Sequence, residues 1–374
     1  MNNICETEDC TGCFACMNIC PQNAISIDRD ILDKTIPKID AKKCIDCGLC
    51  KKVCPVNTKP VFNRAECAYA AWSKDPDDLN KSSSGGIAAV LTRAILNSGG
   101  CAFGAASLER ETKHICVTTI DEAEKLRGSK YVQSNIGFIY RQVKEKLEKE
   151  IKVLFIGTPC QVAGLNSYLR KKYKNLLTVD LICHGVVPHK YLQEYLDKKS
   201  KGKWDTYSFR GINDSYITAY QNGVVTYKRY AEHDIYYSGF YNGLFFRENC
   251  YQCVYSSCKR ASDITIGDFW GIDRSTLKRK YDGKISVVLP NTEKGYSFWE
   301  CVQDQFYSEQ RTIEEAANKL QTNLRNPSPK HEEREFFVKN YPKYGFIKAV
   351  KRTQLGRKIG RLHLKYKIYT ALHR

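Results

Sequence analysis

Apolar positions along the chain recur with two different periods, and together they predict a mixed fold. Short apolar runs typical of strands stand at residues 67–72, 101–106, 115–120, 152–157 and 176–183. Residues 85–96, 136–150 and 160–173 instead follow a helical period, and the first of these segments places Ile87, Val90, Leu91, Ala94 and Ile95 on one face. Strands that alternate with helices predict a sheet covered on its faces.

Two further regions depart from this alternation. Residues 24–28 and 35–40 are typical of two short strands near the N-terminus. After about residue 204 the composition turns to tyrosine and glycine, and residues 216–230 predict a hairpin that turns at Asn222 and Gly223. We therefore expect a β-rich insertion in the larger α/β part.

The cysteine content changes this picture. The chain has 18 cysteines in 374 residues, without an N-terminal signal segment or an apolar run near the roughly 20 residues that a membrane helix needs. We therefore expect a cytoplasmic protein, where thiols stay reduced, and tight local spacings then indicate metal ligands rather than disulfides.

Two identical cysteine motifs occupy the first 54 residues. Both follow the pattern C-x2-C-x2-C-x3-C-P, the first with Cys10, Cys13, Cys16 and Cys20 and the second with Cys44, Cys47, Cys50 and Cys54. In bacterial two-cluster ferredoxins the fourth thiolate of each 4Fe-4S cube comes from the other motif, so Cys54 should complete the first cluster and Cys20 the second. Structural zinc is the alternative, but zinc knuckles are usually separated by a longer spacer. Cys5 lies outside the pattern and is expected to be a bystander.

A candidate phosphate cradle lies at residues 81–90, with Ser83, Ser84, Gly85 and Gly86 before a predicted helix. Backbone amides of such a turn can face an anion, aided by the helix dipole. The alternative is an ordinary N-cap at Ser84. Lys130, in residues 127–134, is a candidate second basic contact or a surface lysine.

The remaining cysteines favour a third cluster. Cys160 follows one predicted buried strand and Cys183 ends the next, where ligands collect at the carboxyl ends of strands. Cys250 and Cys253 form a later C-x2-C pair, with Cys258 nearby. Buried structural thiols are the alternative.

Taken together, several motifs resemble one family over residues 1 to about 290. They are the tandem cysteine motifs, "SSSGG", "GSKYVQS", "GTPCQ", "ICHG", and "CYQC" followed by "SDITIGDFWG". With them the chain resembles the beta subunits of coenzyme F420-reducing hydrogenase and related F420-dependent dehydrogenases, and in particular a bacterial subgroup.

The resemblance implies a flavin-binding α/β domain, with FAD the expected flavin, and a 4Fe-4S cluster close to it. Carried over by position, the ligands of this cluster would be Cys160, Cys183, Cys250 and Cys253, with Cys258 a spare or alternate ligand. Lys130 and His184 are the candidate catalytic residues, a structural role being the alternative for His184. Many organisms with such proteins do not make coenzyme F420, which is a deazaflavin. The acceptor could therefore be F420 or another small molecule.

These observations predict a fold of the α+β and α/β classes in three parts. They are a two-cluster ferredoxin-like module at 1–58, a flavin-binding α/β domain with a β-rich insertion at 59–300, and a helical basic segment at 301–374. The expected function is an iron-sulfur flavoprotein oxidoreductase, because a flavin joins one-electron clusters to a two-electron acceptor. The direction of electron flow is open.

Two other functions are possible on this sequence. The chain could be an electron-transfer subunit that serves a separate catalytic partner. A redox-sensing nucleic-acid binder is a remote alternative, since no recognisable nucleic-acid module is present. In either oxidoreductase role, ferredoxin or another low-potential donor is the expected partner.

The net charge of +18 favours acidic partners, and the C-terminus adds to it. From residue 348 onward there is no Asp or Glu, and the basic residues are Lys348, Lys351, Arg352, Arg357, Lys358, Arg361, Lys365, Lys367 and Arg374. Leu355, Ile359, Leu362, Leu364 and Ile368 lie partly on one helical face. The pattern allows an amphipathic helix that binds an acidic protein or the inner face of an anionic membrane, the alternative being a solvated tail.

Overall fold

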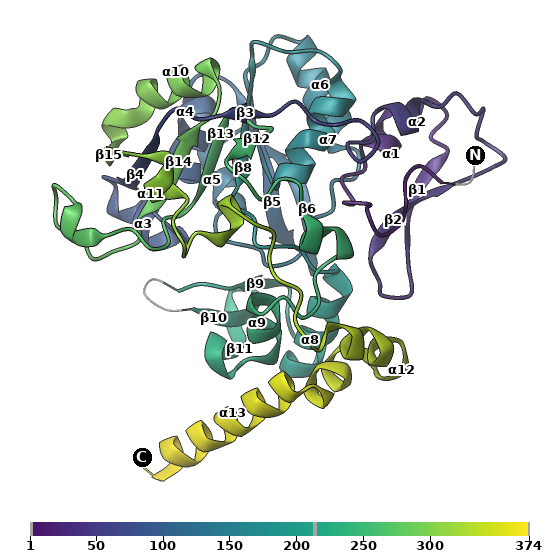
Figure 1. Cartoon of the computed structure of the whole chain (residues 1–374), viewed down its shortest axis with the longest axis vertical. Helices are drawn as coiled ribbons and strands as arrows, with labels where there is room; N and C mark the ends of the chain where they lie inside the picture. The colour runs from purple at the N-terminus through teal and green to yellow at the C-terminus, as the bar shows by residue number, and fades with distance from the viewer. Residues whose placement is uncertain (1–2, 212–214, 373–374) are drawn as a thin grey trace.

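A mixed eight-stranded sheet forms the centre of the computed structural model, which describes residues 3–211 and 215–372 (Figure 1). Arg374 lies outside these residues. The strand order is β15-β4-β14-β13-β8-β7-β5-β6. The strands are β4 (Ala68–Ser73), β5 (Cys101–Leu108), β6 (Glu111–Val117), β7 (Val153–Gly157), β8 (Leu176–Leu181), β13 (Ile264–Asp268), β14 (Ser286–Pro290) and β15 (Phe306–Arg311). β13, β8, β7 and β5 are parallel to one another, and the outer strands pair antiparallel.

Helices cover this sheet, as the alternating pattern predicts. They include α3 (Pro76–Lys81), α4 (Ile87–Asn97), α5 (Ile120–Ala123), α6 (Ile139–Glu148), α7 (Pro159–Leu169), α10 (Glu293–Val302) and α11 (Ile313–Ala316). Ile87, Val90, Leu91 and Ile95 of α4 are buried with strand residues such as Val179. Strand β15 lies in the sheet although it follows residue 300, where the sequence predicts the end of the domain, because it pairs with β4 from Phe306 to Arg311.

The N-terminal module lies at one side of the sheet (Figure 1) and consists of α1 (Ala15–Ile19), β1 (Ile25–Arg29), β2 (Thr35–Ile39) and α2 (Leu49–Lys52). The two predicted short strands form an antiparallel hairpin with Ile25 opposite Ile39. The chain then continues as a strap, in which β3 (Asn63–Arg64) pairs with β12 (Lys259–Arg260). The strap therefore passes beside the segment that carries Cys250 and Cys253.

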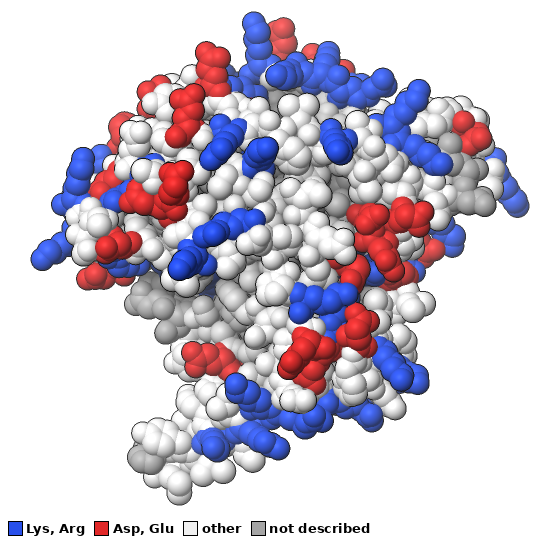
Figure 2. Space-filling model, in the orientation of Figure 1, with Lys and Arg blue, Asp and Glu red and all other residues white. Residues whose placement is uncertain are grey.

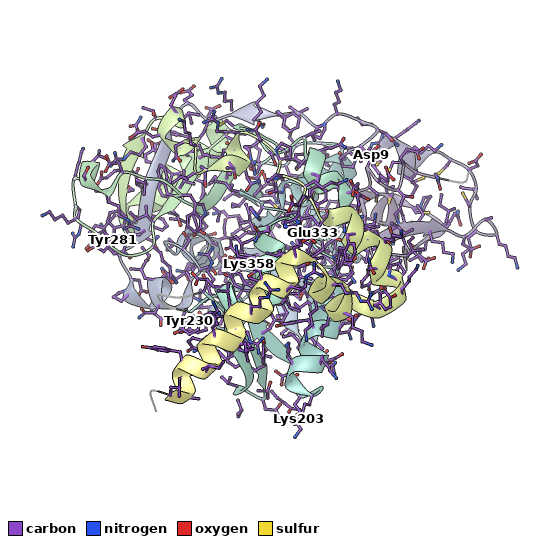
Figure 3. All side chains as sticks on the ribbon, turned by 60° about the horizontal axis from the view of Figure 1, so that its bottom comes forward. Asp9, Lys203, Tyr230, Tyr281, Glu333 and Lys358 are labelled. Atoms are coloured by element: carbon purple, nitrogen blue, oxygen red, sulfur yellow. The ribbon has the colours of Figure 1, made fainter. Side chains whose placement is uncertain are left out.

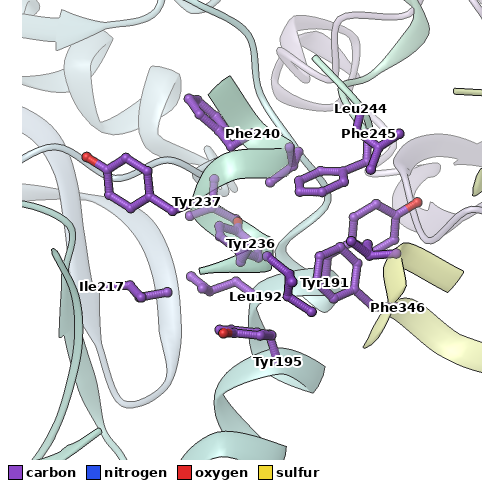
Figure 4. Packing of buried hydrophobic residues seen from close by; sticks show 14 of the residues in the cluster. Tyr191, Leu192, Tyr195, Ile217, Tyr236, Tyr237, Phe240, Leu244, Phe245 and Phe346 are labelled. Carbon is purple, nitrogen blue, oxygen red and sulfur yellow. The ribbon is translucent and has the colours of Figure 1, made fainter. Parts of the chain in front are cut away.

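The predicted insertion is present as a three-stranded sheet, β9 (Thr206–Ser208), β10 (Tyr216–Gln221) and β11 (Val224–Tyr230), with the turn at the predicted Asn222 and Gly223. Helices α8 (His189–Ser200) and α9 (Ile235–Tyr241) pack against it. Aromatic side chains dominate this second core, among them Tyr191, Tyr236, Phe245 and Phe346 (Figure 4).

The C-terminus forms two helices, α12 (Arg334–Arg352) and α13 (Gln354–Leu372), the second of which projects from the body (Figure 1). Both carboxylate oxygens of Glu333 accept backbone N–H groups at the start of α13, from Gln354 at 2.7 Å and Leu355 at 3.1 Å (Figure 3). Ala349, Val350 and Ile359 are buried in the aromatic core. The first part of the basic segment is therefore a packed structure and not a solvated tail, so a deletion from residue 348 would open the core.

Candidate iron-sulfur centres and an anion cradle

Thiols from both N-terminal motifs line a first cavity. Cys10, Cys13 and Cys16 of the first motif meet Cys54 of the second, and Gly12 with its left-handed φ of +66° turns the loop between them. All four thiols are buried. The sequence predicts this exchange of the fourth ligand between the motifs, and the fold brings the expected set together.

The complementary set lines a second cavity in the same module. Cys44, Cys47 and Cys50 lie there with Cys20, whose sulfur accepts the backbone N–H of Ala24 at 3.3 Å. Cys47 is exposed to solvent, unlike the thiols of the first cavity. The second cavity is therefore the one nearer the surface.

Cys5 is closer to the first cavity than its place outside the motif indicates. It lines that cavity, and its hydrogen bonds with the sulfurs of Cys10 and Cys54 raise its pKa far above the ordinary range. The expected bystander is thus a direct neighbour of two proposed ligands.

A third set of thiols gathers at the carboxyl edge of the parallel strands. Cys160 follows β7 at the start of α7, and Cys183 follows β8, which is the parallel neighbour of β7. Cys250 and Cys253 come from the segment after α9. Burial, together with the charges of the other three thiols, raises the pKa of Cys183 well above its ordinary value, so the four side chains lie near one another.

This third set is held in an apolar environment. Burial is the main reason that the pKa of Cys160 rises to about 12 and that of Cys250 to about 11. Such thiols become thiolates when a positive charge is bound among them. In residues 3–211 and 215–372 no three Cys, His, Asp or Glu side chains are arranged around a single metal ion. In a 4Fe-4S cube each thiolate binds its own iron atom.

Cys258 points elsewhere. Its thiol donates to the backbone oxygen of Leu324 at 3.4 Å and packs with the residues of a different core around Trp72. Burial is the main reason that its pKa is raised. The contacts favour a spare thiol over an alternate ligand.

Helix α7 joins the first and third sets. Cys160 stands at its N-terminal end, and Gly164 lies one turn later, so close to Cys13 that a Cβ on Gly164 would be 2.8 Å from the Cβ of Cys13. One helical turn advances about 5.4 Å. The charges of Cys160 and Cys13 add to burial in raising the pKa of Tyr255, which places this ring near both sets. The geometry therefore puts these two sets close together.

The serine-glycine turn lies before α4. Its internal contacts account for the glycines: Gly86 has a φ of +84°, and a Cβ on Gly85 would lie 2.5 Å from the backbone oxygen of Ala71. The hydroxyl of Ser84 accepts from Ser286 at 2.8 Å, and that of Ser83 accepts the N–H of Ser129 at 2.8 Å. The fold therefore requires these serines and glycines, and a bound cofactor would require the same residues.

Basic side chains surround this turn. Lys130 donates to the backbone oxygens of Leu126 and Arg127, and burial lowers its pKa to about 7. Arg210 donates to the backbone oxygen of Ser83 at 3.1 Å, and Lys284 to that of Ser82 at 3.0 Å. Sequence reasoning missed Arg210 and Lys284 because each lies more than 70 residues from the rest of the cradle. A turn that two cations contact, with Lys130 nearby, suits an anionic ligand.

His184 follows Cys183 directly, but its ring nitrogens already have partners. Nε2 donates to the backbone oxygen of Tyr241 at 3.1 Å, and Nδ1 lies 3.1 Å from Oδ1 of Asn323. Phe240 and Phe246 pack against the ring. These contacts favour the structural alternative, and catalytic roles for His184 and Lys130 stay predictions.

Two family models match separate parts of the chain. Residues 9–58 match the family described as a 4Fe-4S dicluster domain. Residues 151–316 match the family described as the C terminus of the coenzyme F420 hydrogenase/dehydrogenase beta subunit.

One similar solved structure is that of the F420-reducing NiFe hydrogenase complex from Methanosarcina barkeri. The identity is 19%, the match covers 70% of this chain and 91% of that chain, and the TM-score is 0.43. None of the curated proteins matches the chain.

The F420 hydrogenase/dehydrogenase domain at residues 151–316 contains the whole third set of thiols. Cys160, Cys183, Cys250 and Cys253 all fall within this range, whereas the serine-glycine turn and Lys130 precede it. The chain is thus an iron-sulfur protein of the electron-transferring oxidoreductase type, related to these beta subunits.

Proposed function

We propose that this protein is an iron-sulfur flavoprotein oxidoreductase that exchanges electrons between a ferredoxin-type donor and a small two-electron acceptor, F420 or another compound. The observation that carries the proposal is the order in which the three sets of thiols lie in the fold. The surface-near set with Cys47 is followed by the buried set with Cys13, and then by the set with Cys160 at the sheet edge. Clusters at these sites would supply one-electron steps and a bound flavin would supply the two-electron step.

The residues of each site have distinct tasks in this proposal. The twelve cysteines would hold the cubes, and the burial of Cys250 limits the access of water to the third set, which tunes the reduction potential. Ser83, Ser84, Gly85 and Gly86 would present the turn to the phosphates of FAD, with Lys130 as a basic contact. Arg210 and Lys284 extend the basic lining.

The segment from Lys130 to Gln133 connects the two ends of this system. Lys130 lies at the cradle, while the side-chain amide of Gln133 donates to the backbone oxygen of Thr11 at 3.1 Å, beside the first cavity. Tyr131 between them packs on Phe240 with ring centroids 4.7 Å apart. This short segment joins the cradle to the first cavity, which supports electron exchange within one chain. A role as an electron-input subunit for a partner oxidoreductase is the second candidate, favoured by the relation to hydrogenase and dehydrogenase beta subunits.

We also propose that α13 holds the protein at an anionic membrane surface. Leu364, Ile368 and Leu372 recur every four residues and are 59%, 52% and 76% exposed, with Arg361 and Lys365 next to them. Figure 2 shows Lys and Arg side chains along this lower part of the molecule. Within the described residues 3–211 and 215–372, no helix is long and apolar enough to cross a membrane. An exposed apolar stripe beside cations suits binding in the plane of the headgroups.

The test is an anaerobic preparation of the chain. Wild type should contain about 12 iron atoms, four per cube, and one flavin. Reduced viologen with a candidate acceptor should give turnover by the single chain. Lys130→Met should keep the iron and bind flavin more weakly. Full iron without any flavin would refute the flavoprotein proposal, and full cofactor content without turnover would favour the subunit role.

A further inference from the structure

Arg247 is a buried cation at the contact between the N-terminal module and the sheet domain. Its side chain is 1% exposed. Its guanidinium donates to the backbone oxygens of Cys10 at 2.8 Å and Thr35 at 3.0 Å, and to Oε1 of Gln133 at 2.9 Å. All three partners are uncharged.

Buried arginines elsewhere in the chain have anionic partners. Arg260 is also 1% exposed, and it forms an ion pair with Asp180 at 3.0 Å. Among the residues that the structure describes, no Asp or Glu lies within 4.0 Å of the Arg247 guanidinium. A buried charge without a counter-charge is costly, so a native fold that keeps one usually supplies an anion.

The groups near Arg247 that become anionic are cysteines of two different sets. Its backbone oxygen accepts the N–H of Cys250 in the third set at 3.0 Å. Its guanidinium reaches the other way and donates to the backbone oxygen of Cys10 in the first set. Arg247 therefore lies beside ligands of both sets.

We propose that Arg247 is a counter-cation shared by the first and third clusters, which raises the reduction potential of both. The proposal rests on the proposed function, because it requires clusters at both sites. Reduction adds one negative charge to a cube, and a fixed cation nearby in a poorly polarisable interior favours the reduced form.

Arg334 provides a matched control. It is 1% exposed, its guanidinium lies 5.8 Å from the ring centroid of Tyr251, the neighbour of Cys250, and Nη2 lies 3.9 Å from Oε2 of Glu248. Its guanidinium donates to the backbone oxygen of Phe246 at 3.0 Å. Loss of this charge should affect the third cluster and leave the first unchanged.

The experiment is a redox titration of the anaerobically purified full-length protein, followed by electron paramagnetic resonance, with iron analysis of each variant. In Arg247→Gln, the equilibrium constant for one-electron reduction should fall at least tenfold at both clusters, a shift of about 59 mV each. Arg247→Lys should keep most of both potentials because it keeps the charge. Arg334→Gln should move one potential only.

Each outcome decides the proposal. Unchanged potentials in fully loaded Arg247→Gln overturn it, as does a shift at one cluster alone. If Arg247→Gln loses iron, retention of iron in Arg247→Lys supports a role for the charge, whereas equal losses in both variants overturn it. Wild type with only about eight iron atoms would instead refute the third cluster and with it the proposed function.

Discussion

Gly164 offers a direct test of the contact between the N-terminal module and the sheet domain. In Gly164→Ala, the new Cβ would lie 2.8 Å from the Cβ of Cys13, 2.9 Å from its sulfur and 3.0 Å from the hydroxyl oxygen of Tyr140. Ordinary carbon contacts are about 3.5–4.0 Å, so α7 and the cysteine loop must separate by roughly 0.7 Å or more.

Overpacking of this kind typically costs about 1–3 kcal/mol. Every 1.4 kcal/mol is a factor of ten, so the module should detach about 5- to 150-fold more often. The carbonyl of Phe14 accepts the backbone N–H of Asn18 in α1, and this helix lies in the detaching module. Hydrogen exchange of the α1 amides in the cofactor-loaded protein should therefore accelerate by that factor.

Gly360→Ala is the matched control, since a Cβ there has no atom within 4 Å. Alanine in an exposed helix is favoured over glycine by about 0.5–1 kcal/mol, so this variant should leave α1 exchange unchanged. Equal exchange in Gly164→Ala and wild type would refute the idea that Cys13 and α7 are in tight contact in solution.

Three further predictions follow from the sites. Cys253→Ser should lose about four of 12 iron atoms, while Cys258→Ser should keep nearly all. The reason is that the thiol of Cys258 faces Leu324 rather than Cys250 and Cys253. Iron loss from Cys258→Ser would require a different ligand set. Burial lowers the pKa of Lys130 to about 7, and a bound phosphate would raise it, so flavin affinity should be highest below pH 7 and fall by up to tenfold per pH unit above it. Lys130→Met should abolish this dependence in a fluorescence titration, and an unchanged slope would exclude Lys130 from the cradle. Replacement of the exposed Leu364 and Ile368 by Ser should weaken cosedimentation with anionic vesicles. Binding by wild type should fall with salt, since charges are screened within about 10 Å at 0.1 M. Equal binding to neutral vesicles would argue against the membrane proposal.

Local sequence determined much of the fold and two of the metal sites. Strands β4, β5, β7 and β8 and helices α4, α6 and α7 lie where the apolar periods predict them, because each pattern reflects which side of an element faces the core. The cysteine loops of the N-terminal module were equally readable. Their ligands stand three residues apart, so one loop carries three thiols wherever the rest of the chain lies.

Tertiary structure alone decided the remaining relations. It placed β15 at the sheet edge, buried the start of the basic C-terminal segment, and turned Cys258 away from Cys250 and Cys253. It also brought Arg210 to Ser83 and Arg247 to Cys10, over separations of 127 and 237 residues. Contacts between such distant segments leave no periodic pattern, because a lone arginine has the same local sequence whether it is solvated or buried between two sets of thiols. Only the packing of the module against the sheet makes that charge part of a site.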